Sequence, residues 1–96
     1  MAIRSFSDGQ TEAFFVTGRP SPKVAWAAVA DVARRKLDML HYAHKLSDLA
    51  SPPGNRLEAL RGPWRGWHSI RINDQWRVVF RWSDSGPTEV AIRDYH

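Results

Sequence analysis

The stretch WHSIRINDQWRVVFRW, residues 67–82, constrains the fold more than any other part of the chain. Apolar residues alternate with polar ones both before and after the polar pair Asn73-Asp74. The apolar positions are Ile70, Ile72, Trp76 and Val78. Alternation with a period of two is typical of a strand with one buried face, and two such runs around a polar pair predict a β-hairpin.

A third strand is expected directly after this hairpin. Ser85-Gly86-Pro87 has the composition of a turn, and the segment TEVAIRDYH, residues 88–96, follows it. Because the connection is short, the new strand must run antiparallel to the one before it. The second half of the chain therefore predicts a three-stranded meander.

An amphipathic helix is predicted between Ser21 and His44. Ser21 suits the N-cap position and Pro22 the first helical position. Apolar residues and one histidine recur at spacings of four and three, which places them on one helical face. They are Trp26, Ala30, Ala33, Leu37, Leu40 and His44. This face is expected to pack against the sheet.

The N-terminal residues predict a brief strand around Ile3 and Phe6, followed by a short helix. Ser7 and Gln10 have the spacing of a capping box, and Gly18 is the expected end of the helix. In the connecting region, Pro-Pro-Gly at 52–54 excludes regular structure, and NRLEAL at 55–60 predicts a turn of helix or a bend. The whole chain, residues 1–96, is expected to form one α+β domain with two N-terminal helices packed on one face of an antiparallel sheet.

Composition limits the classes of function. Lys and Arg outnumber Asp and Glu by 14 to 10, giving a net charge of +4, which favours an acidic partner such as nucleic acid. The chain has no cysteine, so a disulfide or a thiolate metal site is excluded. No apolar run is long enough to span a membrane and no signal-peptide pattern is present, so the expected location is the cytoplasm.

The sequence lacks the residue patterns that metal binding, nucleophilic catalysis and glycine-rich phosphate binding require. His41 and His44 are three apart on the predicted helix, but no third ligand is recognisably placed to join them, so neither metal nor any other cofactor is expected. There is no nucleophile elbow and no glycine-rich phosphate loop. A small-molecule enzyme with a deep pocket is not expected at this length.

Basic and aromatic residues are interleaved in the second half of the chain. The arginines are Arg56, Arg61, Arg65, Arg71, Arg77, Arg81 and Arg93, and the rings are Trp64, Trp67, Trp76, Trp82 and Tyr95. Strand alternation places Arg77, Val79 and Arg81 on the face opposite Val78 and Phe80. Such a face can clamp phosphates and stack on bases. A solvated arginine face that only maintains solubility is the alternative.

The ending Asp94-Tyr95-His96 follows the last strand directly and supplies groups for RNA cleavage. Cleavage without a metal needs a base for the 2′-hydroxyl, an acid for the leaving 5′-oxygen and cations for the charge on phosphorus. An imidazole, a phenol, a carboxylate and the neighbouring arginines meet these needs.

The ordered combination of PPGNRLEAL, HSIRINDQWRVVFRW and the terminal DYH resembles the HigB toxins of the RelE/ParE superfamily. The opening IRSF and the amphipathic helix extend the resemblance over nearly the whole chain. It implies a microbial ribonuclease-like, RelE-like fold and a toxin that cuts messenger RNA in the ribosomal A site without metal. It also implies neutralisation by a HigA-like antitoxin with a helix-turn-helix domain, and operator DNA binding only through that complex.

The resemblance also implies roles for particular residues. Asp94, Tyr95 and His96 match the functional ending of the family, and Arg77 matches an arginine near the scissile phosphate. Arg61 occupies a place where the family carries a basic residue facing RNA. Arg71 and Arg56 complete the predicted RNA-binding set.

Glu58 departs from the pattern, because some relatives carry a histidine at this position. Glu58, Asp94 and His96 are therefore all candidates for the base that removes the 2′-proton, with His96 and Asp94 favoured.

Two other functions remain open on the sequence. ParE relatives share the fold and inhibit DNA gyrase, and they are not expected to need the terminal acid–phenol–imidazole group. A basic module that binds RNA or the ribosome without cleaving anything is the other alternative.

Overall fold

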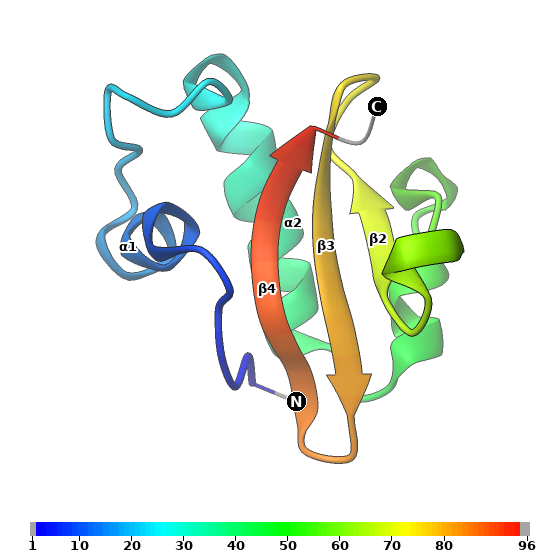
Figure 1. The fold of residues 1–96 in the computed structure, drawn as a ribbon. Helices are drawn as coiled ribbons and strands as arrows, with labels where there is room; N and C mark the ends of the chain where they lie inside the picture. Colours follow the sequence, from blue (N-terminus) through cyan, green and yellow to red (C-terminus); the bar gives the residue numbers. More distant parts are fainter. Residues whose placement is uncertain (1, 95–96) are drawn as a thin grey trace.

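The computed structural model describes residues 2–94, and the predicted α+β architecture is confirmed (Figure 1). Two α-helices precede an antiparallel sheet with the strand order β1-β2-β3-β4. The helices are α1 (Gly9–Thr17) and α2 (Ala30–Tyr42), and the strands are β1 (Glu58–Ala59), β2 (His68–Arg71), β3 (Trp76–Ser83) and β4 (Gly86–Asp94). The 3-10 helices are η1 (Ala27–Val29), η2 (Leu46–Ala50), η3 (Pro53–Asn55) and η4 (Gly62–Trp64).

The predicted meander is also confirmed, with the hairpin turn at Asn73-Asp74. The Asn73 side-chain oxygen accepts hydrogen bonds from the amides of Gln75 and Trp76, at 2.9 and 2.7 Å. These bonds close the turn and fix the register of β2 against β3, in which Ile70 lies opposite Val78. Since side chains alternate across a strand, this register determines which residues reach each face of the sheet.

The β3–β4 pairing contains an irregularity that the alternation pattern does not predict. The register shifts between Val79 and Arg81, and Glu89 on the partner strand has a positive φ of 53°. The extra residue is held from outside the sheet, because the Ser5 hydroxyl accepts a hydrogen bond from the Glu89 amide at 2.9 Å. Such a β-bulge locally bends and twists its strand.

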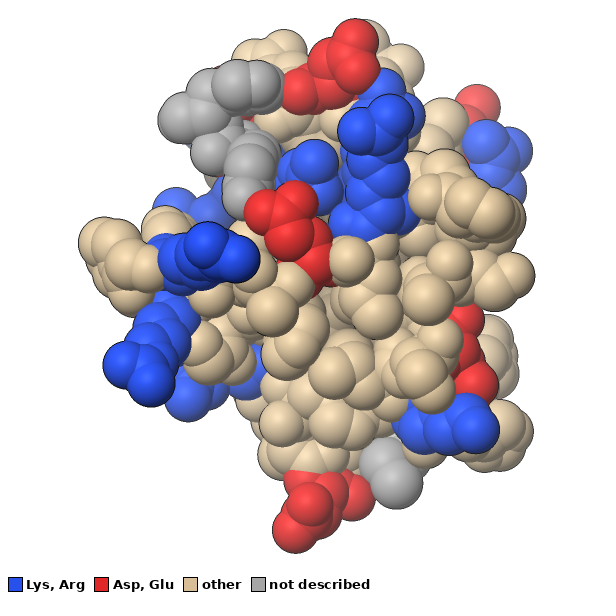
Figure 2. Space-filling model, turned by 90° about the vertical axis from the view of Figure 1, so that its right-hand side faces the viewer, with Lys and Arg blue, Asp and Glu red and all other residues tan. Residues whose placement is uncertain are grey.

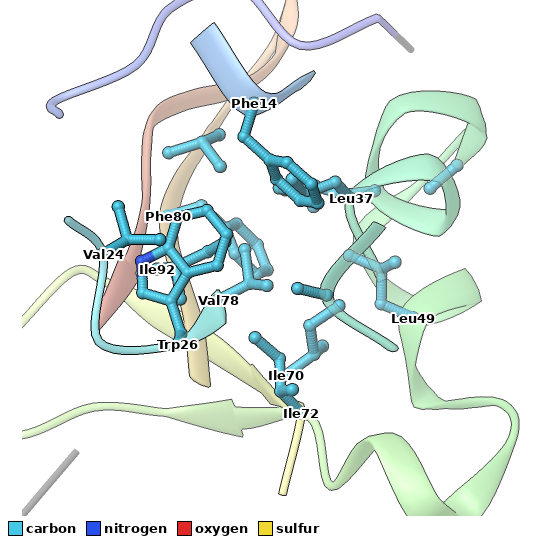
Figure 3. Close-up of a cluster of buried hydrophobic side chains, with 14 residues drawn as sticks. Phe14, Val24, Trp26, Leu37, Leu49, Ile70, Ile72, Val78, Phe80 and Ile92 are labelled. Carbon is cyan, nitrogen blue, oxygen red and sulfur yellow. The ribbon is translucent and has the colours of Figure 1, made fainter. Parts of the chain in front are cut away.

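The main core lies between α2 and the sheet. On α2, Ala33, Leu37 and Leu40 are fully buried, as the predicted stripe requires. Figure 3 shows Leu37 beside Phe14, in the same cluster as the apolar side chains of the sheet. The other labelled core residues are Phe14, Val24, Trp26, Leu49, Ile70, Ile72, Val78, Phe80 and Ile92. In Figure 1, α2 crosses behind β3 and β4 and covers one face of the sheet. We call the other face, which α2 does not cover, the open face, although Leu60, Trp64 and Trp67 pack on part of it.

Helix α1 packs beside β4, and its N-cap differs from the prediction. Asp8, not Ser7, caps the helix: its carboxylate accepts from the Gln10 amide at 2.8 Å and from the Thr11 amide and hydroxyl. The prediction of a Ser7–Gln10 capping box is wrong, because the Ser7 hydroxyl donates to the Glu89 carbonyl instead. The helix ends at Gly18 as predicted, with φ 77°.

Helix α2 begins at Ala30, later than predicted from Ser21-Pro22. The Ser21 hydroxyl does accept from the Lys23 amide, but only turns and η1 follow it. The reason is packing: Trp26 is buried with its ring 4.9 Å from that of Phe14, so this segment leaves the helical path to reach the core.

Three shorter segments also differ from expectation. The predicted first strand is reduced to a single parallel bridge between Phe6 and Val90, because residues 4–7 follow β4 only briefly. The Pro-Pro-Gly segment, in which no regular structure was expected, takes part in the short helix η3. The predicted bend at NRLEAL contains β1, where Glu58 and Ala59 pair with Ser69 and His68. In the part of the chain that the structure describes, no helix has the length and apolar character to cross a membrane.

Candidate functional site

The open face of the sheet carries arginines at equivalent positions of three adjacent strands. In the strand register Arg71 lies opposite Arg77, and Arg77 lies opposite Arg93. We call these residues the arginine row. Like charges directly opposite each other destabilise a sheet, so other contacts must offset the repulsion between these arginines.

Each member of the arginine row has a different compensating contact. Arg77 donates to the Ser69 hydroxyl at 3.3 Å, and its Nη1 lies 3.9 Å from a carboxylate oxygen of Glu58. Arg71 pairs with Asp74 in the hairpin turn. The Arg93 guanidinium lies over the Trp64 ring, 5.0 Å from its centroid.

Arg77 is the most firmly positioned of these cations, since only 14% of its side chain is exposed. Ser69 beneath it is fully buried. The Glu58 carboxylate beside it is 47% exposed, so it is accessible from solvent. Strand β1 sets this contact, because it places Glu58 opposite Ser69. The arrangement holds a cation and an accessible carboxylate within reach of one ligand.

Asn55 fixes the segment that leads into β1, and sequence reasoning missed it. It is fully buried and donates to the carbonyls of Leu49 and Ser51 at 3.2 and 3.3 Å, while its oxygen accepts from Lys36 of α2. Burial, with the nearby charges of Arg35 and Arg71, lowers the pKa of the Lys36 ammonium. An asparagine after Pro-Pro-Gly has the sequence signature of an exposed turn, so no local pattern indicated this role.

A pocket of 270 Å³ opens on the same face, lined by Leu60, Arg61, Trp64, Val79, Arg93 and Asp94. Leu60 and Val79 belong to a second, smaller apolar cluster with Ala91, Trp64 and Trp67. Trp64 and Arg93 belong to the interleaved basic and aromatic set of the sequence, but no local pattern gave either of them an individual role in the site. The register would have indicated Arg93, because it lies opposite Arg77.

The end of β4 lies at the rim of this pocket. Gln75 donates to the Asp94 carboxylate at 3.0 Å, which connects the hairpin turn to the end of the strand. Tyr95 and His96 lie outside the described residues. Figure 2 shows basic side chains over the upper and left-hand parts of the β2 side of the molecule, with acidic side chains between them.

The structure brings together most of the predicted site residues that it describes. Glu58 contacts Arg77, Arg61 and Asp94 line one pocket, and Arg71 is the neighbour of Arg77 in the register. Arg56 is different: it is exposed, has a positive φ of 47° at the end of η3, and does not line the pocket.

The two histidines that were predicted to share one helix lie in different surroundings. His41 accepts a hydrogen bond from the Ile3 amide at 3.2 Å and packs on Phe15, whereas His44 lies beyond the end of α2. Among residues 2–94, no group of three or more His, Asp or Glu side chains is placed to hold a metal ion.

The family model described as a RelE-like toxin of the type II toxin-antitoxin system HigB matches residues 4–96. The chain belongs to this family. It is therefore a toxin of a type II toxin-antitoxin pair, and its partner is an antitoxin. The family match favours the HigB interpretation over the ParE-like gyrase inhibitor.

Two relatives agree with this assignment. Toxin HigB-1 of Vibrio cholerae is 44% identical over 69 residues, which cover 72% of this chain and 68% of the relative. An uncharacterized protein of Haemophilus influenzae is 32% identical over 80 residues, covering 83% and 78%.

One solved structure shows the same RelE-like fold. A YoeB/ParE toxin from Agrobacterium tumefaciens matches over 100% of both chains with a TM-score of 0.54. Because it is only 22% identical in sequence, this likeness concerns the fold alone.

Proposed function

We propose that this HigB-family toxin is a ribosome-dependent endoribonuclease that cuts messenger RNA in the A site and so stops translation. The arginine row carries the proposal. Three adjacent strands place like charges side by side on an open face, which costs stability unless a polyanion binds there. An RNA backbone is such a polyanion, and it agrees with the net charge of +4.

Arg77 is proposed to stabilise the transition state. Cleavage by the neighbouring 2′-hydroxyl concentrates negative charge on the phosphate oxygens, and a preorganised guanidinium aimed there stabilises it without rearrangement. The low exposure of Arg77 and its bond to Ser69 supply this preorganisation. Arg71 and Arg61 are proposed to bind the adjoining phosphates, and Arg56 a more distant one.

The proton transfers are proposed for the end of the chain. A base takes the 2′-proton while the O2′–P bond forms, and an acid gives a proton to O5′ as the P–O5′ bond breaks. The products are a 2′,3′-cyclic phosphate and a 5′-hydroxyl, and the step needs no further reactant. His96 and Asp94 are favoured for these roles, with Tyr95 positioning or stacking on the substrate.

Glu58 remains the competing base. Its carboxylate is accessible and lies beside Arg77, so a 2′-hydroxyl bound near that arginine would be within its reach.

The proposed partners follow from this activity. The antitoxin is proposed to be HigA-like with a helix-turn-helix domain, and operator DNA to be bound only by the toxin–antitoxin complex. The ribosome and its mRNA place the toxin in the bacterial cytoplasm, with no cofactor required.

Primer extension on a reporter mRNA in a reconstituted translation reaction tests the proposal. The wild-type chain should give discrete cuts that require ribosomes, and His96→Ala should lose them. Asp94→Asn and Glu58→Gln, assayed beside it, separate the candidate bases. Arg19→Ala, an exposed arginine after α1, is the control for loss of one positive charge. A folded wild-type chain that arrests growth without cutting mRNA would contradict the proposal.

A further inference from the structure

The pocket on the open face has the size and walls of a site for one planar ring. Its volume of 270 Å³ is below the roughly 300–1,000 Å³ of pockets that hold drug-sized ligands. Leu60 and Val79, which line it, are only 8% and 3% exposed. A pocket this small, with apolar walls and charged side chains at its edge, suits a single heterocycle attached to an anionic chain.

The indole of Trp64 forms the aromatic wall of the pocket. Trp67 packs edge-on against it, with ring centroids 5.1 Å apart and an interplanar angle of 84°. This perpendicular contact holds the orientation of the Trp64 ring. The guanidinium of Arg93 lies over a face of the same ring.

The contact between Arg93 and Trp64 can be displaced. Cation–π contacts at exposed sites contribute only about 0.5–1 kcal/mol, and the Arg93 side chain is exposed. A base stacked on an aromatic side chain contributes more, about 1–3 kcal/mol. The strand register keeps a displaced Arg93 opposite Arg77, where a backbone phosphate is expected.

We propose that this pocket binds one unpaired nucleobase of the RNA, stacked on Trp64, while Arg93 moves from the ring to a neighbouring phosphate. The inference rests on the proposed function, because it takes the RNA from there. Arg61 and Asp94 line the same pocket, so the edge of the base meets a donor and an acceptor. The pocket thus fixes one nucleotide relative to the end of β4.

Binding of short single-stranded RNA tests the pocket without the ribosome. Two 2′-O-methyl pentanucleotides of identical charge serve as probes, one with a central 2-aminopurine and one with an abasic site. The wild-type chain should bind the 2-aminopurine probe about 5- to 150-fold more tightly than the abasic probe, as expected for one stacked base. Stacking should also quench the 2-aminopurine fluorescence.

Substitutions separate stacking from simple burial. Trp64→Leu keeps an apolar side chain but has no aromatic face, so it should bind both probes equally. Trp64→Phe keeps a ring and should retain much of the preference. Trp82→Phe is the matched control, because Trp82 packs on the helix-covered core and should retain the full preference. Circular dichroism confirms that each variant is folded.

The outcomes separate this inference from the proposed function. Equal binding of both probes by the wild-type chain, no binding of either, or an unchanged preference in Trp64→Leu would overturn the base pocket. The wild-type chain is tested in parallel for mRNA cleavage. Cleavage without base preference refutes only the pocket, whereas base preference without cleavage refutes only the nuclease.

Discussion

The two faces of β3 serve opposite purposes, although their residues alternate along the chain. Val78 and Phe80 point into the core under α2 and are fully buried. Arg77 and Arg81 point to the open face, where Arg77 contacts Glu58 and Arg81 lies over the Trp67 ring. The covered face gains stability by excluding water, whereas the open face places like charges together. Stability and the proposed activity thus depend on neighbouring residues of one strand.

The largest effect on stability is expected from the covered face. Phe80→Ala removes a fully buried ring and should lower the free energy of unfolding by about 3–5 kcal/mol, measured by chemical denaturation. Since small domains have only about 5–15 kcal/mol in total, Phe80→Leu is the milder member of the series. Arg81→Ala, next in sequence but on the open face, should change stability by less than about 1 kcal/mol. Equal losses at both positions would remove the distinction between the faces.

The open face should show the reverse pattern. Arg77→Ala should slow mRNA cleavage by about 100-fold or more, as loss of a preorganised donor to a developing anion does. Its free energy of unfolding should change by less than about 1 kcal/mol, because losing the Glu58 and Ser69 contacts is offset by relief from Arg71 and Arg93. Arg77→Lys retains the charge but not the forked geometry, and should recover only part of the rate. An Arg77→Ala variant that cleaves normally but unfolds easily would assign Arg77 to structure.

The smallest effect is expected from a histidine at the margin of the covered face. His68 stacks on Phe80 with ring centroids 6.1 Å apart, and burial lowers the pKa of its imidazole below the ordinary 6.5. The folded state therefore binds fewer protons than the unfolded state just below pH 6.5, so stability should fall as the pH drops below that value. His68→Phe should flatten this part of the pH profile, measured by denaturation between pH 7 and pH 5. The exposed His44→Gln is the control, and an unchanged slope in His68→Phe would contradict the assignment.

Local periodicity predicted the parts of the fold whose residues interact with near neighbours in sequence. The meander followed from alternation around Asn73-Asp74, and the helical stripe from spacings of three and four. The errors arose where distant residues compete. The Ser7 hydroxyl donates to the Glu89 carbonyl on β4, and Trp26 packs in the core next to Phe14. Both contacts override a local capping signal.

The candidate site was predictable to the extent that strand register could be inferred. Alternation placed Arg77 and Arg81 together, and the antiparallel register adds Arg93. The contact of Glu58 with Arg77 could not be predicted from the sequence. It depends on a strand of two residues and on the buried Asn55, which fixes the segment that leads into this strand. Neither feature has a periodic signal, since each is determined by a few contacts to remote backbone.

The outer edge of β4 is already occupied by the N-terminal part of the chain. Ser5 and Ser7 exchange backbone hydrogen bonds with Val90, and the Thr11 hydroxyl accepts from the Ile92 amide. A peptide that binds by extending a sheet needs free donors and acceptors along an edge strand. An inhibitor of this toxin that adds a strand at β4 would therefore first have to displace residues 4–11 from that edge, whereas one that binds side chains on the open face would not.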